Sequence, residues 1–205
     1  MPSPLFRLAA IAGACFACAT ALAQTTVTVA QPADIRSTNP GVNRDNTTDG
    51  IVLNMVEGLV AYRQDGSVGP LLAQSVDVSK DGLTYTFKLR RGVKFHNDAP
   101  LTSADVAWSW KRYMDPKTDW RCLSEYDGRN GLKVVDAATP DDATFVLKIN
   151  RPSAVFLDTL ALSDCGMTAI LHPSSVKPDG SWDKPVGTGP FKFGEWKRGE
   201  YVTVT

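Results

Sequence analysis

The chain has 205 residues, of which 43% are hydrophobic and 21% are charged, and its formal net charge is +0. This balance is typical of a folded globular protein and excludes an intrinsically disordered one. Neither a basic stripe nor, after the N-terminus, a long apolar run is present, so we expect no nucleic-acid binding and no membrane span.

Residues 1–23 have the composition of a secretory signal peptide. An apolar run rich in small residues ends at Ala21-Leu22-Ala23, which fits an A-x-A cleavage site. The run is too short and too rich in alanine for a membrane-spanning helix. We therefore expect the mature chain to begin at Gln24 and to be exported.

The cysteine pattern predicts a disulfide. Cys15 and Cys18 leave with the signal peptide, and the residues before them fit a lipoprotein signal poorly, so a lipid anchor is kept only as an alternative. Cys122 and Cys165 remain, an even number in an oxidising compartment, and we expect them to pair. Two separately buried free thiols are the other possibility.

The chain before residue 80 alternates short strands with one helix and one long polar loop. In chain order we expect a strand at 25–30, a loop at 32–48, a helix capped by Thr47 or Thr48 and ended by 57–59, a strand at 59–62 and a strand at 74–79. A loop as long as 32–48 in a compact domain is usually functional or mobile.

The stretch 80–115 reads as turn, strand, loop and helix. Lys80-Asp81-Gly82 is a turn signal, and the alternation over 83–89 is typical of a half-buried strand, so 74–79 and 83–89 should form a hairpin. Thr102 and Asp105 have the spacing of a capping box at the start of a helix. Asp115-Pro116 should end that helix, because the residue before a proline avoids the helical region.

The chain beyond residue 115 is predicted to contain strands, one short helix and irregular segments. In chain order we expect an irregular segment at 119–131, a strand at 132–138, a turn at 139–142, a strand at 144–149, a short helix opened by 151–153 and running to 162, an extended piece at 164–171, a turn-rich segment at 172–184 anchored by Trp182, and strands at 190–196 and 201–205.

No constellation of residues predicts catalysis or a cofactor. Two histidines without cysteine ligands are too few for a self-contained zinc site, and His96 is interpreted as a structural, hydrogen-bonded residue. The chain has no G-x-S-x-G nucleophile elbow. Gly187-Thr188-Gly189 lacks the G-K-[ST] ending of a phosphate-binding loop and precedes a strand rather than a helix. We therefore predict a protein that is not an enzyme and holds no metal or cofactor.

The stretch 81–112 resembles the signature of the bacterial extracellular solute-binding proteins of family 5, the oligopeptide, dipeptide and nickel receptors of ABC importers. The family run is DG-x-TYTF-x-LR-x-GVKFHDG-x-P-x-TA-x-DV-x-(F/Y)S-x-x-R, and the residues that match it are Asp81-Gly82, Thr84 to Phe87, Leu89-Arg90, Gly92 to His96, Asp98, Pro100, Thr102, Asp105-Val106, Ser109 and Arg112. The family's glycine is missing at Ala99. Further similar steps are Pro70 to Ser75, Asp115 to Thr118 and Gly187 to Phe191.

The resemblance implies an α/β fold of the periplasmic-binding-protein type II, peptide-binding subgroup. It predicts a discontinuous first lobe made of 24–55 and 180–205, with an α+β subdomain at 56–179 inserted into it. The second lobe of the family is missing from this chain. A single lobe cannot close on a ligand, so residues 24–205 alone are expected to bind solute weakly or not at all.

The resemblance also implies where solute would bind. In the family the first strand delivers a loop with an Asn-Pro step into the cleft, so residues 39–47 are expected to line it. Ligand-binding candidates are Arg44, Asn46 and Thr47 in this loop, Trp120 and Tyr126 in the irregular segment, and Thr188 at the return to the first lobe. Arg44 could pair with a ligand carboxylate, and the two aromatic side chains could stack on apolar ligand groups. Core packing is the alternative for Trp120 and Tyr126.

The function that the resemblance implies is capture of a peptide or similar small solute in the periplasm, by a monomer that delivers it to an ABC permease at the inner membrane. Three alternatives share much of this chemistry: a metal or metallophore receptor of the same family, a ligand-binding sensor without transport, and a truncated fragment without function. A secreted enzyme is not expected, because no catalytic constellation is present.

Overall fold

The computed structural model describes residues 26–43 and 45–205. The predicted signal peptide at 1–23 and Arg44 lie outside the described residues. Residues 26–30 belong to a different unit from 31–205, and the strand expected at 25–30 is wrong where it is described, because residues 26–30 have no strand assignment. An alternating sequence becomes a strand only when a neighbour pairs with its backbone, and no ladder in the described part includes these residues.

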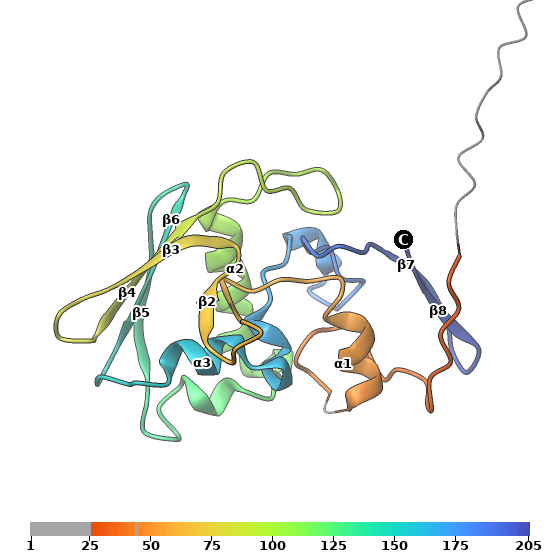
Figure 1. Cartoon of the computed structure of the whole chain (residues 1–205), viewed down its shortest axis with the longest axis horizontal. Helices are drawn as coiled ribbons and strands as arrows, with labels where there is room; N and C mark the ends of the chain where they lie inside the picture. Colours follow the sequence, from red (N-terminus) through yellow and green to blue (C-terminus); the bar gives the residue numbers. More distant parts are fainter. Residues whose placement is uncertain (1–25, 44) are drawn as a thin grey trace, which may run out of the picture. The chain divides into compact units, whose positions relative to one another are not determined.

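The largest sheet is antiparallel, with its four strands in the order β3-β4-β6-β5 (Figure 1). These strands are β3 (Ala73–Val78), β4 (Thr84–Leu89), β5 (Val134–Asp141) and β6 (Thr144–Ile149). The predicted hairpin of β3 and β4 is confirmed, with Val76 opposite Phe87. The turn expected at 139–142 is wrong, because β5 extends to Asp141, which pairs with Thr144.

One helix packs on this sheet and is also hydrogen-bonded to the segment that carries Ala169 and Leu171. Helix α2 (Ser103–Met114) begins at Thr102, whose N–H donates to the Asp105 carboxylate at 2.9 Å, so the predicted capping box is present. The Ser109 hydroxyl both donates to and accepts from the backbone of Leu171, at 3.1 and 2.9 Å. One turn later the Tyr113 hydroxyl donates to the Ala169 carbonyl at 2.8 Å.

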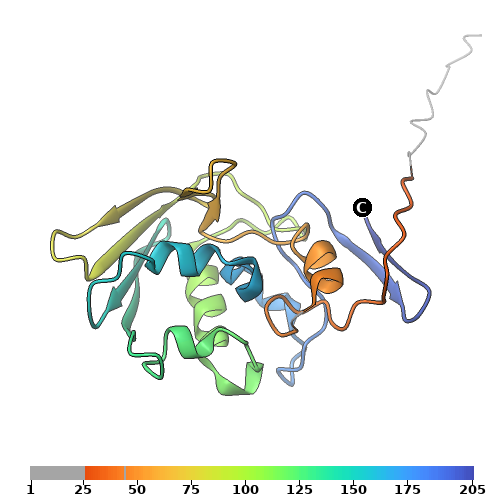
Figure 2. The same ribbon diagram turned by 60° about the horizontal axis from the view of Figure 1, so that its bottom comes forward.

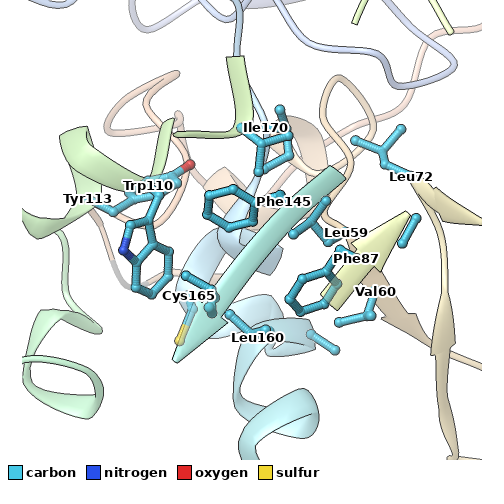
Figure 3. Close-up of a cluster of buried hydrophobic side chains, with 14 of the residues drawn as sticks. Leu59, Val60, Leu72, Phe87, Trp110, Tyr113, Phe145, Leu160, Cys165 and Ile170 are labelled. Atoms are coloured by element: carbon cyan, nitrogen blue, oxygen red, sulfur yellow. The ribbon is translucent and has the colours of Figure 1, made fainter. Parts of the chain in front are cut away.

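Two clusters of buried apolar side chains lie in the described chain. The larger lies between the sheet, α2 and α3 (Phe156–Ala161), and Figure 3 shows Phe87 and Phe145 among its members. The smaller consists of Val52, Met55, Val56, Ala169 and Leu171. Ser109 and Tyr113 connect the two, because they bond to the strip that carries Ala169 and Leu171.

The remaining elements are short. They are α1 (Asn46–Val52), β1 (Val60–Tyr62), β2 (Val68–Pro70), the 3-10 turns η1 (Pro116–Thr118), η2 (Leu123–Glu125), η3 (Ser163–Thr168) and η4 (Pro173–Ser175), and the hairpin of β7 (Phe193–Lys197) and β8 (Tyr201–Val204). Figure 2 shows α1 next to the segment that leads into β7.

Two expectations for this part of the chain are wrong. Helix α1 begins two or three residues earlier than expected, because the side chain of Asp45, rather than Thr47 or Thr48, accepts from a helix N–H, and it ends at Val52 instead of continuing to 57–59. The piece at 164–171, expected to be extended, forms η3 over most of its length, with left-handed backbone at Gly166 and Met167. The proposed lobe boundaries at 55, 56, 179 and 180 stay a prediction.

In the part of the chain that the structure describes, no helix is both long and apolar enough to cross a membrane.

Candidate solute-binding site

The loop that was expected to line a cleft leads directly into α1, and its end is fixed by local hydrogen bonds. The Asp45 carboxylate accepts from the N–H of Thr48 at 2.7 Å, and the Thr48 hydroxyl accepts from the N–H of Arg36 at 2.9 Å. Thr48 is buried, whereas Asn46 is exposed and Thr47 is partly exposed in the first turn of α1. The side chains of Asn46 and Thr47 are therefore not buried by the capping.

The loop is supported by three consecutive residues, Trp120, Arg121 and Cys122. The Trp120 indole N–H donates to the Cys165 carbonyl at 2.9 Å, and the backbone N–H of Arg121 donates to the Gly41 carbonyl at 3.1 Å. Cys122 and Cys165 are joined by a disulfide, with their Cα atoms 5.5 Å apart. The disulfide segment therefore lies against the loop as well as against the core.

Two glycines make the contact between loop and disulfide segment possible. A Cβ on Gly41 would lie 2.6 Å from the Cys165 carbonyl oxygen and 2.6 Å from the Trp120 indole nitrogen. A Cβ on Gly166 would lie 2.6 Å from the Gly41 backbone nitrogen. Both glycines also have positive φ, +73° and +66°, which side-chain-bearing residues rarely adopt.

Side chains from α2 and from the turn-rich segment hold the start of the loop. Arg112 donates to the Asn39 side-chain oxygen at 3.0 Å, and the Trp182 indole N–H donates to the Thr38 hydroxyl at 2.9 Å. The Arg112 guanidinium carbon also lies 5.0 Å from the centre of the Trp182 ring, within the range of a cation–π contact. Burial lowers the pKa of Arg112, which is nonetheless charged at any physiological pH.

The Gly187-Thr188-Gly189 step packs on the backbone that follows α1. A Cβ on Gly187 would lie 2.3 Å from the Met55 carbonyl oxygen, and one on Gly189 would lie 2.6 Å from the Asn54 carbonyl oxygen. These glycines are therefore needed for the close approach of two backbones. Between them, the Thr188 hydroxyl donates to the Glu57 carboxylate at 2.8 Å and is partly exposed.

The structure places Trp120 and Tyr126 in the core, which corrects their assignment as ligand contacts. Their side chains are 3% and 1% exposed, and their rings stack on each other at 5.5 Å between centroids. Burial raises the pKa of the Tyr126 hydroxyl. An aromatic ring in an irregular segment looks the same in sequence whether it faces a ligand or the core, and here the apolar neighbours from α2 and α3 decide the outcome.

The other predicted residues divide into two places. Asn46 and Thr47 lie together at the start of α1, and Thr188 lies against Glu57. Among the described residues no hydrogen bond or ion pair joins Thr188 to Asn46 or Thr47. Arg44 lies outside the described residues. A separate hollow of about 140 Å³ has Tyr126 in its wall and none of the other predicted residues.

Residue-level reasoning missed the side chains that hold the loop. Glu57, Arg112, Arg121 and Trp182 bond to it or to its neighbours over long sequence separations. Arg112 belongs to the family signature, which could have drawn attention to it. Nothing in the sequence distinguishes Arg121 from an ordinary surface arginine.

No set of three or more His, Cys, Asp or Glu side chains in the described part is arranged to hold a metal ion. What the geometry offers is a supported loop that presents polar side chains and, in a separate place, a threonine–glutamate pair. Such groups orient a small polar ligand by hydrogen bonds.

Comparison with known proteins places the chain in a family. Residues 67–205 match the family model described as bacterial extracellular solute-binding proteins, family 5 Middle. The chain belongs to this family. A glutathione-binding protein of Salmonella choleraesuis is 31% identical over 186 residues, which are 90% of this chain and 35% of that protein. An oligopeptide-binding protein of Bacillus subtilis is 27% identical over 183 residues, 82% of this chain and 33% of that protein.

A solved structure of a similar protein agrees with the fold. The binding protein of A. tumefaciens R10 in complex with agropinic acid matches with a TM-score of 0.74 and 34% identity, over 84% of this chain and 34% of that one. The mixed α/β fold is thus that of the periplasmic binding proteins. The chain spans about a third of the length of each of these relatives.

Proposed function

We propose that this chain is part of a periplasmic binding protein that captures a peptide-like or similar small solute and delivers it to an ABC permease in the inner membrane. The family match over 67–205 is the observation that carries the proposal. Relatives named for binding glutathione, itself a tripeptide, and oligopeptides support a solute with amide and carboxylate groups. The relative bound to agropinic acid extends the range to other small organic acids.

Within this proposal, Arg44, Asn46, Thr47 and Thr188 contribute to solute binding from this lobe. Arg44 supplies the positive charge for a solute carboxylate, and Asn46 supplies both a hydrogen-bond donor and an acceptor. Thr188 reaches the solute from the return segment, with its hydroxyl oriented by Glu57. Trp120 and Tyr126 are not included, because their rings are used in core packing.

Capture by this family's fold depends on two lobes. A solute that binds the closed arrangement more tightly than the open one shifts the protein toward closure, and the permease then reads the closed form. The residues named above supply one wall of the cleft in this scheme. The other wall is outside this chain's 205 residues.

Titration calorimetry on the complete protein purified from the periplasm of its host tests the proposal. The probes are glutathione, an oligopeptide and agropinic acid, with nickel ion as a separate arm. The proposal predicts saturable binding of an organic probe, weakened in Asn46→Ala and Thr188→Val but not in Ser67→Ala, a turn residue. Binding of nickel alone would favour the metal receptor, and binding of none of the probes would contradict the proposal.

Two further measurements separate the remaining alternatives. A solute recovered chemically unchanged after long incubation argues against a secreted enzyme. Loss of solute uptake in a strain lacking the protein is expected for a transport component, whereas a sensor would leave uptake intact.

A further inference from the structure

Arg121 lies where three parts of the structure meet. Its side chain is only 6% exposed, and one terminal nitrogen lies 2.9 Å from the Asp49 carboxylate, which is 17% exposed, and 3.4 Å from the Ser163 carbonyl. Its backbone N–H bonds to the Gly41 carbonyl. A single residue thus connects α1, the disulfide-bearing η3 segment and the loop at 39–45.

This ion pair is poorly arranged for stability. The Nε and Nη1 groups of Arg121 are buried and have no hydrogen-bond partner among the described residues. Burial raises the pKa of Asp49 even though Arg121 is adjacent, so desolvation outweighs the attraction for this carboxyl. A buried pair with unsatisfied N–H groups contributes little net stability and is often replaceable by apolar side chains. We therefore expect the ion pair to contribute more to the placement of the groups that it joins than to the free energy of unfolding.

The pair ties α1, which carries Asp49, to the segment that carries Arg121. This helix has seven residues, too few to be stable by its own hydrogen bonds, so its direction depends on tertiary contacts. Asp49 is three residues after Asn46, on the same side of the helix, and holding Asp49 therefore fixes the rotation of the turn that carries Asn46. The planar, forked guanidinium restrains direction as well as distance, which a lysine would not do.

The geometry points to Arg121 as a positioning residue for solute binding: through Asp49 it sets the orientation of α1, and so the placement of Asn46 and Thr47, without touching the solute itself. This inference rests on the proposed function, because Asn46 and Thr47 contact solute only in that proposal. It assigns Arg121 a role in affinity that exceeds its role in stability.

The test uses the complete protein carrying Asp49→Asn, or Arg121→Met together with Asp49→Asn, so that no buried charge is left unpaired in the double variant. The matched control is Arg129→Met with Asp127→Asn, which removes an exposed pair of similar separation, 2.7 Å. Affinity for glutathione or the oligopeptide is measured by calorimetry well below the thermal midpoint, and the midpoint is measured in parallel.

The expected result is an affinity about tenfold weaker in both Asp49 variants, because the side chains of Asn46 and Thr47 must then be ordered when solute binds. The Tm of the double variant should lie within about 3 °C of the parent's. The control should change neither quantity. The single variant Arg121→Lys keeps a positive charge next to Asp49, but its affinity for the probe should still be lower than that of the parent. A lowered Tm with unchanged affinity would assign the pair a purely structural role and overturn the inference.

Hydrogen–deuterium exchange provides a readout that needs no solute. Backbone amides of α1 should exchange faster in the variants, while those of β4 and β6 stay unchanged. Equal protection of α1 in parent and variants would overturn the inference whatever the probes show. Failure of the parent to bind any probe would instead count against the proposed function, so the two failures are distinguishable.

Discussion

The imidazole Nε2 of His96 lies 2.8 Å from the carbonyl oxygen of Gly189, 93 residues further along the chain. The backbone N–H of His96 also donates to the Gly187 carbonyl at 2.9 Å. Because a carbonyl only accepts, His96 carries its proton on Nε2 when neutral. The histidine of the first family motif and the glycines of the last therefore form one junction between distant parts of the chain.

Replacing His96 should weaken this junction. His96→Leu removes the donor and leaves the buried Gly189 carbonyl without its partner, at a cost of about 1–3 kcal/mol in the free energy of unfolding. His96→Gln, whose amide can still donate, should lose less than half as much. Urea unfolding at neutral pH measures both, and a His96→Leu variant as stable as the parent would contradict this account.

The two glycines of the same junction should tolerate no side chain. Gly189→Ala places a Cβ 2.6 Å from the Asn54 carbonyl oxygen, so two backbone segments must separate, and we expect a loss of about 3 kcal/mol or more. Gly50→Ala is the matched control, because nothing lies within 4 Å of its Cβ position in α1. That control should gain up to about 1 kcal/mol. Similar urea midpoints for the two variants would be inconsistent with the close approach.

Local patterns were sufficient for the elements that carry their own signals. The period-two alternation around Phe87 and Phe145 predicted β4 and β6, and the Thr102–Asp105 spacing predicted the start of α2. The prediction of an extended piece at 164–171 was wrong, because contacts with residues distant in sequence determine the conformation of this segment. Trp120 bonds to the Cys165 carbonyl, and Gly166 packs on Gly41, so this segment folds around the loop.

The site was less predictable than the fold for a related reason. The family resemblance directed attention to the loop that precedes α1, but it could not say which aromatic rings face a cleft. Trp120, an aromatic residue in an irregular segment, was predicted to contact a ligand, but it is buried in the core. The supporting residue Arg121 acts through a contact with Asp49, 72 residues earlier, which no local pattern encodes.

The disulfide gives a direct stability prediction. Cys122 and Cys165 are 43 residues apart, and closing a loop of that size should stabilise the fold by roughly 4 kcal/mol in the chain-entropy model. The variant with both cysteines replaced by alanine should lose most of that amount in urea unfolding. A free-thiol assay on the denatured, unreduced protein should find neither thiol, and two titratable thiols would contradict the pairing.

Acid should destabilise the protein below its carboxylates' ordinary pKa. Hydrogen bonds lower the pKa of six exposed or partly exposed aspartates, which are Asp34, Asp65, Asp81, Asp127, Asp141 and Asp179. A lowered folded-state pKa contributes stability that is present above the unfolded value, 3.8, and is lost as pH falls through the lower folded value. Unfolding free energy should therefore fall steeply below about pH 4.

One carboxyl should act in the opposite direction. The pKa of Asp49 is raised by burial, so its ionisation opposes folding as pH rises from 3.8 through the folded value. Relative to the parent, Asp81→Asn should flatten the acid limb of the stability profile, and Asp49→Asn should steepen it. Asp77→Asn is the charge control on an exposed strand position. Identical profiles for the three variants would argue against these assignments.

The central claim is that this chain belongs to a protein that holds a small solute without transforming it. Native mass spectrometry of the protein purified from its host's periplasm tests this most directly, because a bound solute appears as a fixed added mass. The account predicts such a mass, released unchanged as an organic compound with amide or carboxylate groups and replaced by added solute. A protein that carries no solute and binds none of the probes, or one that releases a chemically altered probe, would contradict it.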